Sequence, residues 1–305
     1  MRLGIDVGGT KTEAVVVDDA GQVVDRVRGA TGWGVRAVIE TIEYLAGLLA
    51  DRAASSFRDF ESIGIGIPGQ IPRGTTRVTQ AVNLGIEDFD LGTELAARLG
   101  TPVAVENDVN AAALGARSVL GIENSMAYLN LGTGVAAGIV VDGTLRRGSR
   151  GVAGEVGHIS IDPAGPPCAC GQRGCIESFA GGAQIAARWG GGGDRPITDV
   201  FDSADRGDPL ALQIRAGLVR GLASAIQILV LSHDVETVVV GGGVVAIGNR
   251  LIDLLNDALN VVAGESHFIA SLDLANRVVR LPSGSPAAAL GAALLPALAH
   301  PVSVS

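Results

Sequence analysis

The sequence predicts an α/β protein that contains a duplicated structural unit. Glycine is abundant, at 44 of 305 residues, and aromatic residues make up only 3% of the chain, which is typical of Val/Ala-rich cores joined by tight glycine turns. Short Val/Ile-rich runs alternate with segments of helical periodicity, and an internal repeat links the two halves. A chain of this length is expected to form two domains with sizeable cores.

The internal repeat is the most specific of these observations. Residues 130–142 align with residues 6–18 at a constant offset of 124, without a gap. Each copy is predicted to be a strand, a glycine hairpin, a second strand and a turn, so we expect a second α/β unit that starts near residue 111. Alternatively, glycine hairpins between valine strands resemble one another by chance.

The first half is expected to open with an antiparallel meander, because turn residues separate three alternating runs. A helix follows, since Val35, Val38, Ile39 and Ile42 recur with a period of 3.6 residues. Pro68-Gly69 ends the next strand. The expected elements here are strands at 2–7, 11–18, 22–28, 62–67 and 102–105 and helices at 35–54, 91–99 and 109–117.

The second half continues from the repeated hairpin with long apolar helices and two further strands. The expected helices are 182–189, 209–231, 249–262 and 286–299, and the strands are 237–240 and 277–281. We expect the closing helix to return to the first half. The predicted domains are therefore a small one at residues 1–110, completed by a C-terminal helix at about 287–305, and a large one at 111–286.

Charge and hydropathy exclude some classes of protein. The net charge of -9 argues against a nucleic-acid partner, which requires a basic face. No apolar run is predicted to span a membrane: the longest, at 286–299, is broken by Gly291 and Pro296. The N-terminus begins directly with a strand pattern and shows no leader. We therefore expect a cytoplasmic protein.

All three cysteines, Cys168, Cys170 and Cys175, lie within eight positions, and His158 precedes them by ten residues. Three Cys and one His form a standard structural zinc set, which predicts a zinc loop at 158–175. Plain buried thiols, or a disulfide with one free thiol, are the alternatives. A zinc hydrolase is disfavoured because four protein ligands leave no open position. The carboxylates of Glu155 and Glu177 flank the loop, so we expect the metal to brace residues that face a substrate.

Three glycine-rich turns follow predicted strands, at residues 8–10, 132–134 and 241–243. Glycine lets the backbone approach a phosphate closely, and threonine adds a donor. None has the P-loop or Rossmann spacing. Two equivalent turns in a duplicated unit are expected to grip nucleotide phosphates from both sides of a cleft. Lys11, the only lysine, directly follows the first turn; alternatively it is an ordinary surface charge.

Glu106, Asn107 and Asp108 end a predicted buried strand, where an α/β unit presents functional groups. A carboxylate there could accept the proton of a hydroxyl that attacks phosphorus. Alternatively, Asp108 is a helix N-cap.

Taken in order, these motifs resemble the ROK family (repressors, open reading frames, sugar kinases), and within it the bacterial glucokinase-like enzymes. The resemblance covers essentially the whole chain. The zinc loop and the Glu155-x-x-His158 element are its most specific parts. The resemblance implies two RNase H-like (actin-like ATPase) domains with sugar and ATP in the interdomain cleft. It also implies transfer of the γ-phosphoryl group from ATP to a hexose hydroxyl, usually O6, structural Zn²⁺, Mg²⁺ with ATP, and a homodimer or homotetramer.

The resemblance assigns roles residue by residue. It implies that Asp108 is the general base and that Asp6 helps to hold magnesium through water. The implied sugar ligands are Asn83, Asn107, Asp108, Glu155, His158 and Glu177. The implied nucleotide-side positions are Gly9, Thr10, Lys11, Thr133, Gly134 and Gly242. The implied zinc ligands are His158, Cys168, Cys170 and Cys175.

Two features leave the sugar open. The family often has Pro-Asn-Leu where this chain has Val82-Asn83-Leu84. Downstream the family often has an aromatic residue, where this chain continues Gly-Ile-Glu-Asp-Phe at 85–89. Glucose is the first expectation, with other hexoses and amino sugars, and polyphosphate as donor, as alternatives. A non-catalytic sugar sensor of the same family is the alternative function. Intact Asp108, Lys11 and phosphate turns argue against it, and only six residues up to Asp6 leave no room for a repressor's helix-turn-helix.

Overall fold

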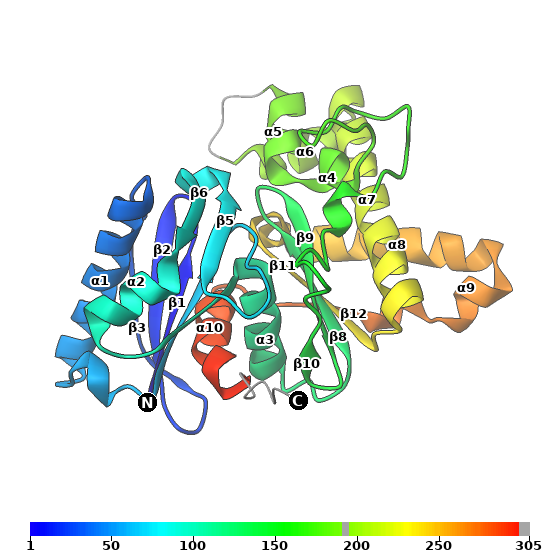
Figure 1. The fold of residues 1–305 in the computed structure, drawn as a ribbon. Helices are drawn as coiled ribbons and strands as arrows, with labels where there is room; N and C mark the ends of the chain where they lie inside the picture. Colours follow the sequence, from blue (N-terminus) through cyan, green and yellow to red (C-terminus); the bar gives the residue numbers. More distant parts are fainter. Residues whose placement is uncertain (191–194, 299–305) are drawn as a thin grey trace. The chain divides into compact units, whose positions relative to one another are not determined.

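The structure is a computed structural model that describes residues 1–190 and 195–298. The described residues form two five-stranded sheets, one two-stranded sheet and the helices that cover them (Figure 1). The order of the first five-stranded sheet is β3-β2-β1-β4-β7, and that of the second is β10-β9-β8-β11-β12. The α/β class is as predicted.

The first sheet begins with the predicted antiparallel meander of β1 (Arg2–Val7), β2 (Lys11–Val17) and β3 (Val23–Ala30). β1 also pairs in parallel with β4 (Ser62–Ile67), which pairs in parallel with β7 (Val103–Asn107). The carboxyl ends of β1, β4 and β7 therefore lie along one edge of the sheet.

The second sheet repeats this arrangement with β8 (Met126–Leu131), β9 (Val135–Val141), β10 (Thr144–Leu145), β11 (Thr237–Gly241) and β12 (Val278–Arg280). β8 and β9 begin and end 124 residues after β1 and β2, since 2 + 124 = 126 and 17 + 124 = 141. β11 pairs in parallel with β8 and β12, as β4 does with β1 and β7. The repeat in the sequence is therefore a repeat of structure.

The chain divides into two compact units. The first comprises residues 1–123, 138–153 and the described part of 284–305; the second comprises residues 124–137 and 154–283. The predicted domain boundary near residue 110 stays a prediction. The closing helix α10 (Ala287–Leu298) packs on β1, β4 and α3 (Asp108–Leu120), all within the first unit, and residues 299–305 of the predicted C-terminal helix lie outside the described residues.

Two layers of helix cover the first sheet. α1 (Val35–Arg52) and α2 (Leu91–Leu99) share a core with Leu3 and Ile5 on one face. α10 packs with Val15 and Val17 on the other. A Cβ atom on Gly4 would lie 2.0 Å from the carbonyl oxygen of Ala289, so the backbone of α10 lies directly on β1. Glycine is required there because any side chain would displace the helix.

The second unit is mostly helical outside its strands. Its helices are α4 (Ile176–Ala180), α5 (Gly182–Trp189), α6 (Pro196–Asp205), α7 (Pro209–His233), α8 (Asn249–Glu265) and α9 (His267–Ser271). Short 3₁₀ turns lie at Val156–His158, Gly243–Ile247 and Leu274–Arg277. In the first unit they lie at Phe57–Asp59 and Val82–Leu84. α4, α6 and α9 were not among the expected helices.

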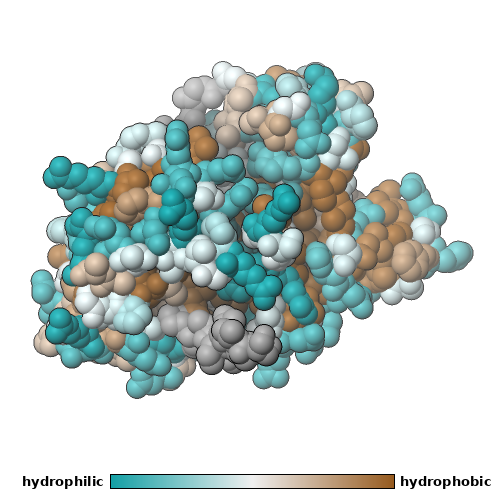
Figure 2. All heavy atoms as spheres, in the orientation of Figure 1, coloured by the Kyte–Doolittle hydropathy of each residue, from teal (hydrophilic) through white to brown (hydrophobic). Residues whose placement is uncertain are grey.

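α7 is the one helix in the described part of the chain that is long and apolar enough to cross a membrane. The sequence predicted a helix at 209–231, but 286–299 was taken there as the longest apolar run. Most of its apolar window, 61%, is buried inside the protein, which is typical of a core helix. Apolar side chains also reach the surface over α8 and α9, where Val261 and Phe268 are exposed (Figure 2).

Candidate active site and metal centre

A row of charged residues crosses the first sheet one residue before its carboxyl edge. Asp6 on β1 pairs in register with Gly66 on β4, which pairs with Glu106 on β7. In the other direction Asp6 faces Glu13 on β2, which faces Arg28 on β3. Arg26 and Arg28 both donate to Glu13 Oε1. The sheet thus concentrates carboxylates at the edge where its parallel strands end.

Asp6 is the most perturbed carboxyl group of this row. Burial raises its pKa to about 7, and the negative charges of Asp108 and Glu13 add to the rise, while Lys11 and Arg28 oppose it. Asp108 lies on the same part of the sheet, because a Cβ atom on Gly66, the β4 partner of Asp6, would lie 3.5 Å from Asp108 Cα. Two such carboxylates are suited to a hard cation such as Mg²⁺, which prefers oxygen ligands and keeps several waters.

Asn107, not Asp108, caps α3. Asn107 Oδ1 accepts from the N–H groups of Val109 (2.9 Å) and Asn110 (3.2 Å), and its Nδ2 donates to Gly69 O (3.1 Å). The alternative that Asp108 is the N-cap is therefore wrong. Asp108 is the first residue of the helix, and its Oδ1 accepts from Val109 N–H at 2.9 Å. At most one hydrogen of Asn107 Nδ2 remains for a ligand.

Glu106 has a structural environment. Its side chain is 5% exposed, and it accepts from Asn107 N–H and Asn110 Nδ2, both at 3.0 Å, and from Arg147 Nε. Sequence reasoning missed Arg147, which lies 41 residues further along the chain. The one available signal was the cost of a buried carboxylate at a strand end, which requires a cationic partner.

The first glycine turn lies against Asn83. The turn closes through Gly8 N–H to Lys11 O at 3.0 Å, and a Cβ atom on Gly9 would lie 3.3 Å from Asn83 Nδ2. Thr10 and Lys11 are exposed. The structure thus brings together one predicted sugar ligand and three predicted nucleotide-side residues within the first unit.

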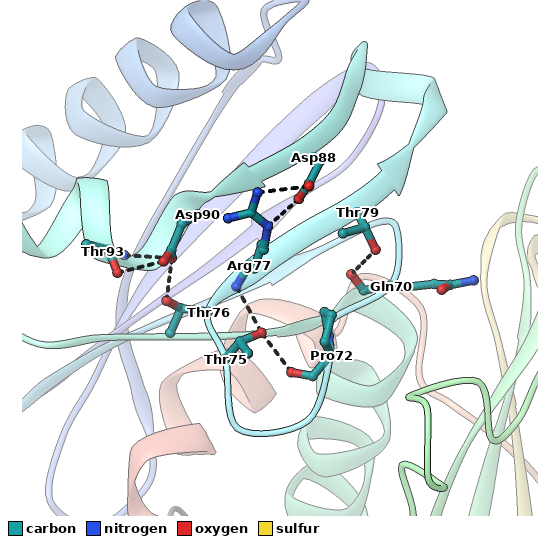
Figure 3. A network of polar contacts seen from close by, with 9 residues as sticks. All are labelled: Gln70, Pro72, Thr75, Thr76, Arg77, Thr79, Asp88, Asp90 and Thr93. Carbon is teal, nitrogen blue, oxygen red and sulfur yellow. Dashed lines mark hydrogen bonds and ion pairs between the residues drawn. The ribbon is translucent and has the colours of Figure 1, made fainter.

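Asn83 lies at the turn of a hairpin that the sequence interpretation missed, between β5 (Arg77–Ala81) and β6 (Ile86–Asp90). Polar contacts hold this hairpin in place (Figure 3). Arg77 pairs with Asp88 across the strands, and Asp90 caps α2 and accepts from Thr76 Oγ1 at 2.7 Å. The hairpin is therefore fixed at its base, on the side away from Asn83.

The four predicted zinc ligands form one cluster, with their ligand atoms within 4.8 Å of one another. Cys170 Sγ lies 3.7 Å from Cys175 Sγ, and Cys168 Sγ lies 3.9 Å from His158 Nδ1. A tetrahedral zinc with Zn–S bonds of about 2.3 Å separates two sulfurs by about 3.8 Å, so the cluster fits a closed structural site. Both alternatives are disfavoured: 3.7 Å far exceeds a disulfide bond, and Cys170 is exposed.

Two of the thiols have strongly shifted pKa values. The N–H of Gln172 lowers the pKa of Cys170 to about 6, so this thiol is a ready thiolate. Burial raises the pKa of Cys175 to about 12, so deprotonation of that group depends on a bound cation. Because Nδ1 of His158 faces the sulfurs, its Nε2 is directed elsewhere.

Glu155, His158 and Glu177 lie near one another in the second unit. Glu155 is exposed, but surrounding atoms partly desolvate its carboxyl group and so raise its pKa. The charge of His158 opposes this rise in pKa, and the charge of Glu177 adds to it. Glu177 also reaches the second glycine turn, where its Oε2 accepts from Val135 N–H at 2.9 Å. A Cβ atom on Gly242 would lie 2.5 Å from Leu131 O, so the third glycine turn lies beside the end of β8.

Comparisons with known proteins agree over nearly the whole chain. The model of the ROK family matches residues 2–297. The chain is 34% identical to a glucokinase of Halalkalibacterium halodurans over 82% of each protein. It is also 34% identical to an N-acetylmannosamine kinase of Yersinia pseudotuberculosis, over 79% of this chain and 82% of that protein.

Solved structures show the same likeness. A ROK hexokinase from Thermus thermophilus is 31% identical, with a TM-score of 0.81 and 96% of each chain covered. A ROK glucokinase from Streptomyces griseus, solved with glucose and AMPPNP, is 28% identical, with a TM-score of 0.76 and coverage of 96% and 98%. A ROK transcriptional regulator is 25% identical, with a TM-score of 0.74; the match covers 97% of this chain and 78% of the regulator.

Proposed function

This chain belongs to the ROK family and has the actin-like ATPase fold of ROK kinases, and from that premise we propose that it is an ATP-dependent sugar kinase. It transfers the γ-phosphoryl group of ATP to a hexose hydroxyl, with glucose O6 as the first candidate. The observation that carries the proposal is the placement of Asp108 on the first turn of α3, beside the buried carboxyl group of Asp6. The glucokinase and N-acetylmannosamine kinase relatives support the same reaction class.

Asp108 acts as the general base. The Asn107 cap fixes the start of α3, and the N–H of Val109 holds one carboxylate oxygen of Asp108. A base held in this way can accept the proton of the substrate hydroxyl while that oxygen attacks the γ-phosphorus.

Carboxylate and amide groups bind the sugar, because their acceptors and donors match a ring of hydroxyls. Glu155, Glu177 and His158, through Nε2, serve from the second unit. Asn83 and Asn107 serve from the first, together with Asp108. Val82 precedes Asn83 where the family often has proline, and the relatives are named for different sugars, so the test below compares several sugars.

The glycine turns bind the nucleotide through backbone N–H groups at Gly9, Thr133, Gly134 and Gly242, with Thr10 and Lys11 as further donors. Asp6 would help to hold the Mg²⁺ that arrives with ATP, and the ion would supply positive charge against the phosphates. The Cys168, Cys170, Cys175 and His158 cluster holds structural zinc. A cytoplasmic location and a homodimer or homotetramer remain predictions.

The proposal is tested with a panel of hexoses and amino sugars in ATP and Mg²⁺, with ADP release as the readout. One sugar should give turnover, and Asp108→Asn should lower kcat about 10²-fold or more with sugar affinity nearly intact. Asp253→Asn, an exposed carboxylate on α8, is the matched control and should keep full turnover.

The competing function is a sugar sensor without turnover, which the likeness to a ROK regulator favours. A sensor would bind a sugar in the same panel without releasing ADP. That result, or near-normal turnover of Asp108→Asn, would contradict the proposal.

A further inference from the structure

The segment that follows the zinc loop holds the second glycine turn from behind. Gly182 N–H donates to Gly132 O at 3.0 Å, and Ala183 N–H donates to Thr133 O at 3.1 Å. Both donors belong to the start of α5. In a third bond, Val135 N–H donates at 2.9 Å to Oε2 of Glu177, which belongs to α4. Two consecutive carbonyl groups of the turn are thus bound to one helix start.

This binding sets where the turn's own donors point. In a planar trans peptide the N–H group points opposite to the C=O group of the same unit. Because the carbonyls of Gly132 and Thr133 face α5, the N–H groups of Thr133 and Gly134 face away from it. Two adjacent N–H groups that point the same way form an anion-binding concavity, so the α4–α5 segment orients a phosphate-binding surface.

Glu177 occupies the space at the back of this turn. A Cβ atom on Gly134 would lie 2.3 Å from Glu177 Oε2, so the carboxylate fills the room that a side chain would need. Gly181 N–H donates to the carbonyl oxygen of Glu177 at 2.8 Å, which closes α4 directly before α5. The N-cap of α4 is Cys175, a member of the metal cluster.

We propose that Glu177 is a positioning residue for the nucleotide, in addition to the sugar contact proposed above. Together with the start of α5 it holds the 132–134 turn in the conformation that binds phosphate. Because Oε2 accepts from Val135 N–H, Oε1 is the oxygen that contacts the sugar. One carboxylate thus contacts the sugar and supports the turn that binds the nucleotide. The inference rests on the proposed function, because it requires a nucleotide on this turn.

The test is the affinity for AMPPNP with Mg²⁺ in the absence of sugar, measured by calorimetry. Glu177→Ala should weaken nucleotide binding about tenfold, because Val135 N–H loses its acceptor. Glu177→Gln should bind close to wild type, because the amide oxygen can still accept that bond. Glu265→Ala is the matched control: it removes an exposed carboxylate at the end of α8 in the same unit and should leave nucleotide affinity unchanged. Zinc content is measured for each variant, so that metal loss is recognised.

A double-mutant cycle adds a second measure. Gly134→Ala should weaken nucleotide binding because its methyl group displaces the Glu177 carboxylate. In the Glu177→Ala background the same change should have a smaller effect, so the two effects should not add. Additive effects would contradict the inference.

The inference and the proposed function fail in different ways. If wild-type protein binds AMPPNP and Glu177→Ala binds it equally well while its sugar affinity falls, Glu177 is a sugar ligand only and the inference is overturned. Wild-type protein that neither binds AMPPNP nor releases ADP would overturn the proposed function, and the inference with it.

Discussion

The two glycine hairpins have the same place in sheets of the same order, yet different parts of the chain support them. The first turn closes on itself, through Gly8 N–H to Lys11 O, and is joined by Thr31 N–H to Thr10 O at 3.1 Å, directly after β3. The second closes one residue earlier, through Gly132 N–H to Gly134 O at 3.1 Å, and is held by α4 and α5. Duplication thus preserved the strands, whereas each turn depends on its own neighbours.

Removal of the metal is expected to produce the largest difference between the two hairpins. Cys175→Ser should lose zinc, because one of four ligands is gone and the site contributes folding energy when filled. Amide exchange should then accelerate in residues 156–189 and in the 132–134 turn, and nucleotide affinity should fall tenfold or more. The first turn, which lies in the other unit, should keep its protection.

Ser160→Ala is the matched control, because it removes one loop hydrogen bond, to Arg173 O, and no ligand. It should retain the metal. Unchanged exchange at 132–134 in the metal-free Cys175→Ser protein would show that the second turn does not depend on the zinc loop.

The first unit relies on the ion pair between the buried Glu106 and the partly exposed Arg147, where the second relies on a metal cluster. Arg147→Met should destabilise the protein by roughly 3 kcal/mol, because it leaves the buried Glu106 carboxylate without its cation. Urea unfolding measures the change. Arg146→Met, which removes only an exposed pair with Asp142, should cost less than about 0.5 kcal/mol. Recovery of stability in Glu106→Gln with Arg147→Met would confirm the cause; equal losses in both single arginine variants would refute it.

The carboxyl row of the first sheet gives that unit a pH dependence. The pKa of Asp6 is about 7 in the folded state, whereas its ordinary value is 3.8. Between these two pH values the native state therefore binds more protons than the unfolded state. Stability should therefore be greatest below about pH 4 for this group and fall as pH rises towards 7, by roughly 2–4 kcal/mol in total. Asp6→Asn should remove this slope in unfolding measured without added magnesium. A variant with the wild-type slope would exclude Asp6 as its source.

The smallest expected effect compares the two turns directly. Gly9→Ala should change nucleotide affinity by about threefold or less, because its Cβ atom would meet the flexible amide end of Asn83 at 3.3 Å and the backbone oxygen of Asn83 at an ordinary contact distance of 3.4 Å. Gly134→Ala, against the bonded Glu177 carboxylate at 2.3 Å, should have the larger effect. Equal effects would show that the two turns are supported alike.

The sequence predicted best what depends on local pattern. Strands at 2–7 and 62–67 and helices at 91–99 and 182–189 have the expected bounds, because hydrophobic period and turn residues are encoded within each segment. The 124-residue offset and the four metal ligands were also recognisable, since spacing alone carries them.

The features that were missed depend on distant partners. β5 and β6 are short and polar and are joined by the Arg77–Asp88 pair, so their periodicity is weak. Arg147 has no local feature that links it to Glu106. Whether Asn107 or Asp108 caps α3 depends on the exact residue at which the helix begins. Predicted helix boundaries are uncertain by one or two residues, so the sequence could not decide between them.

The contact of α10 with Gly4 and Gly64 has a consequence for synthesis of the chain. The ribosome makes β1 before the second unit and makes α10, the helix that packs on β1, after that unit. Domains usually fold in the order in which they emerge. Here the part of the first sheet that α10 covers lacks this helix until residues 287–293 leave the exit tunnel, although α3 already packs on β4 and β7. The second unit can fold while the first is still waiting for its final helix, so the nascent protein exposes Val15 and Val17 for most of its translation.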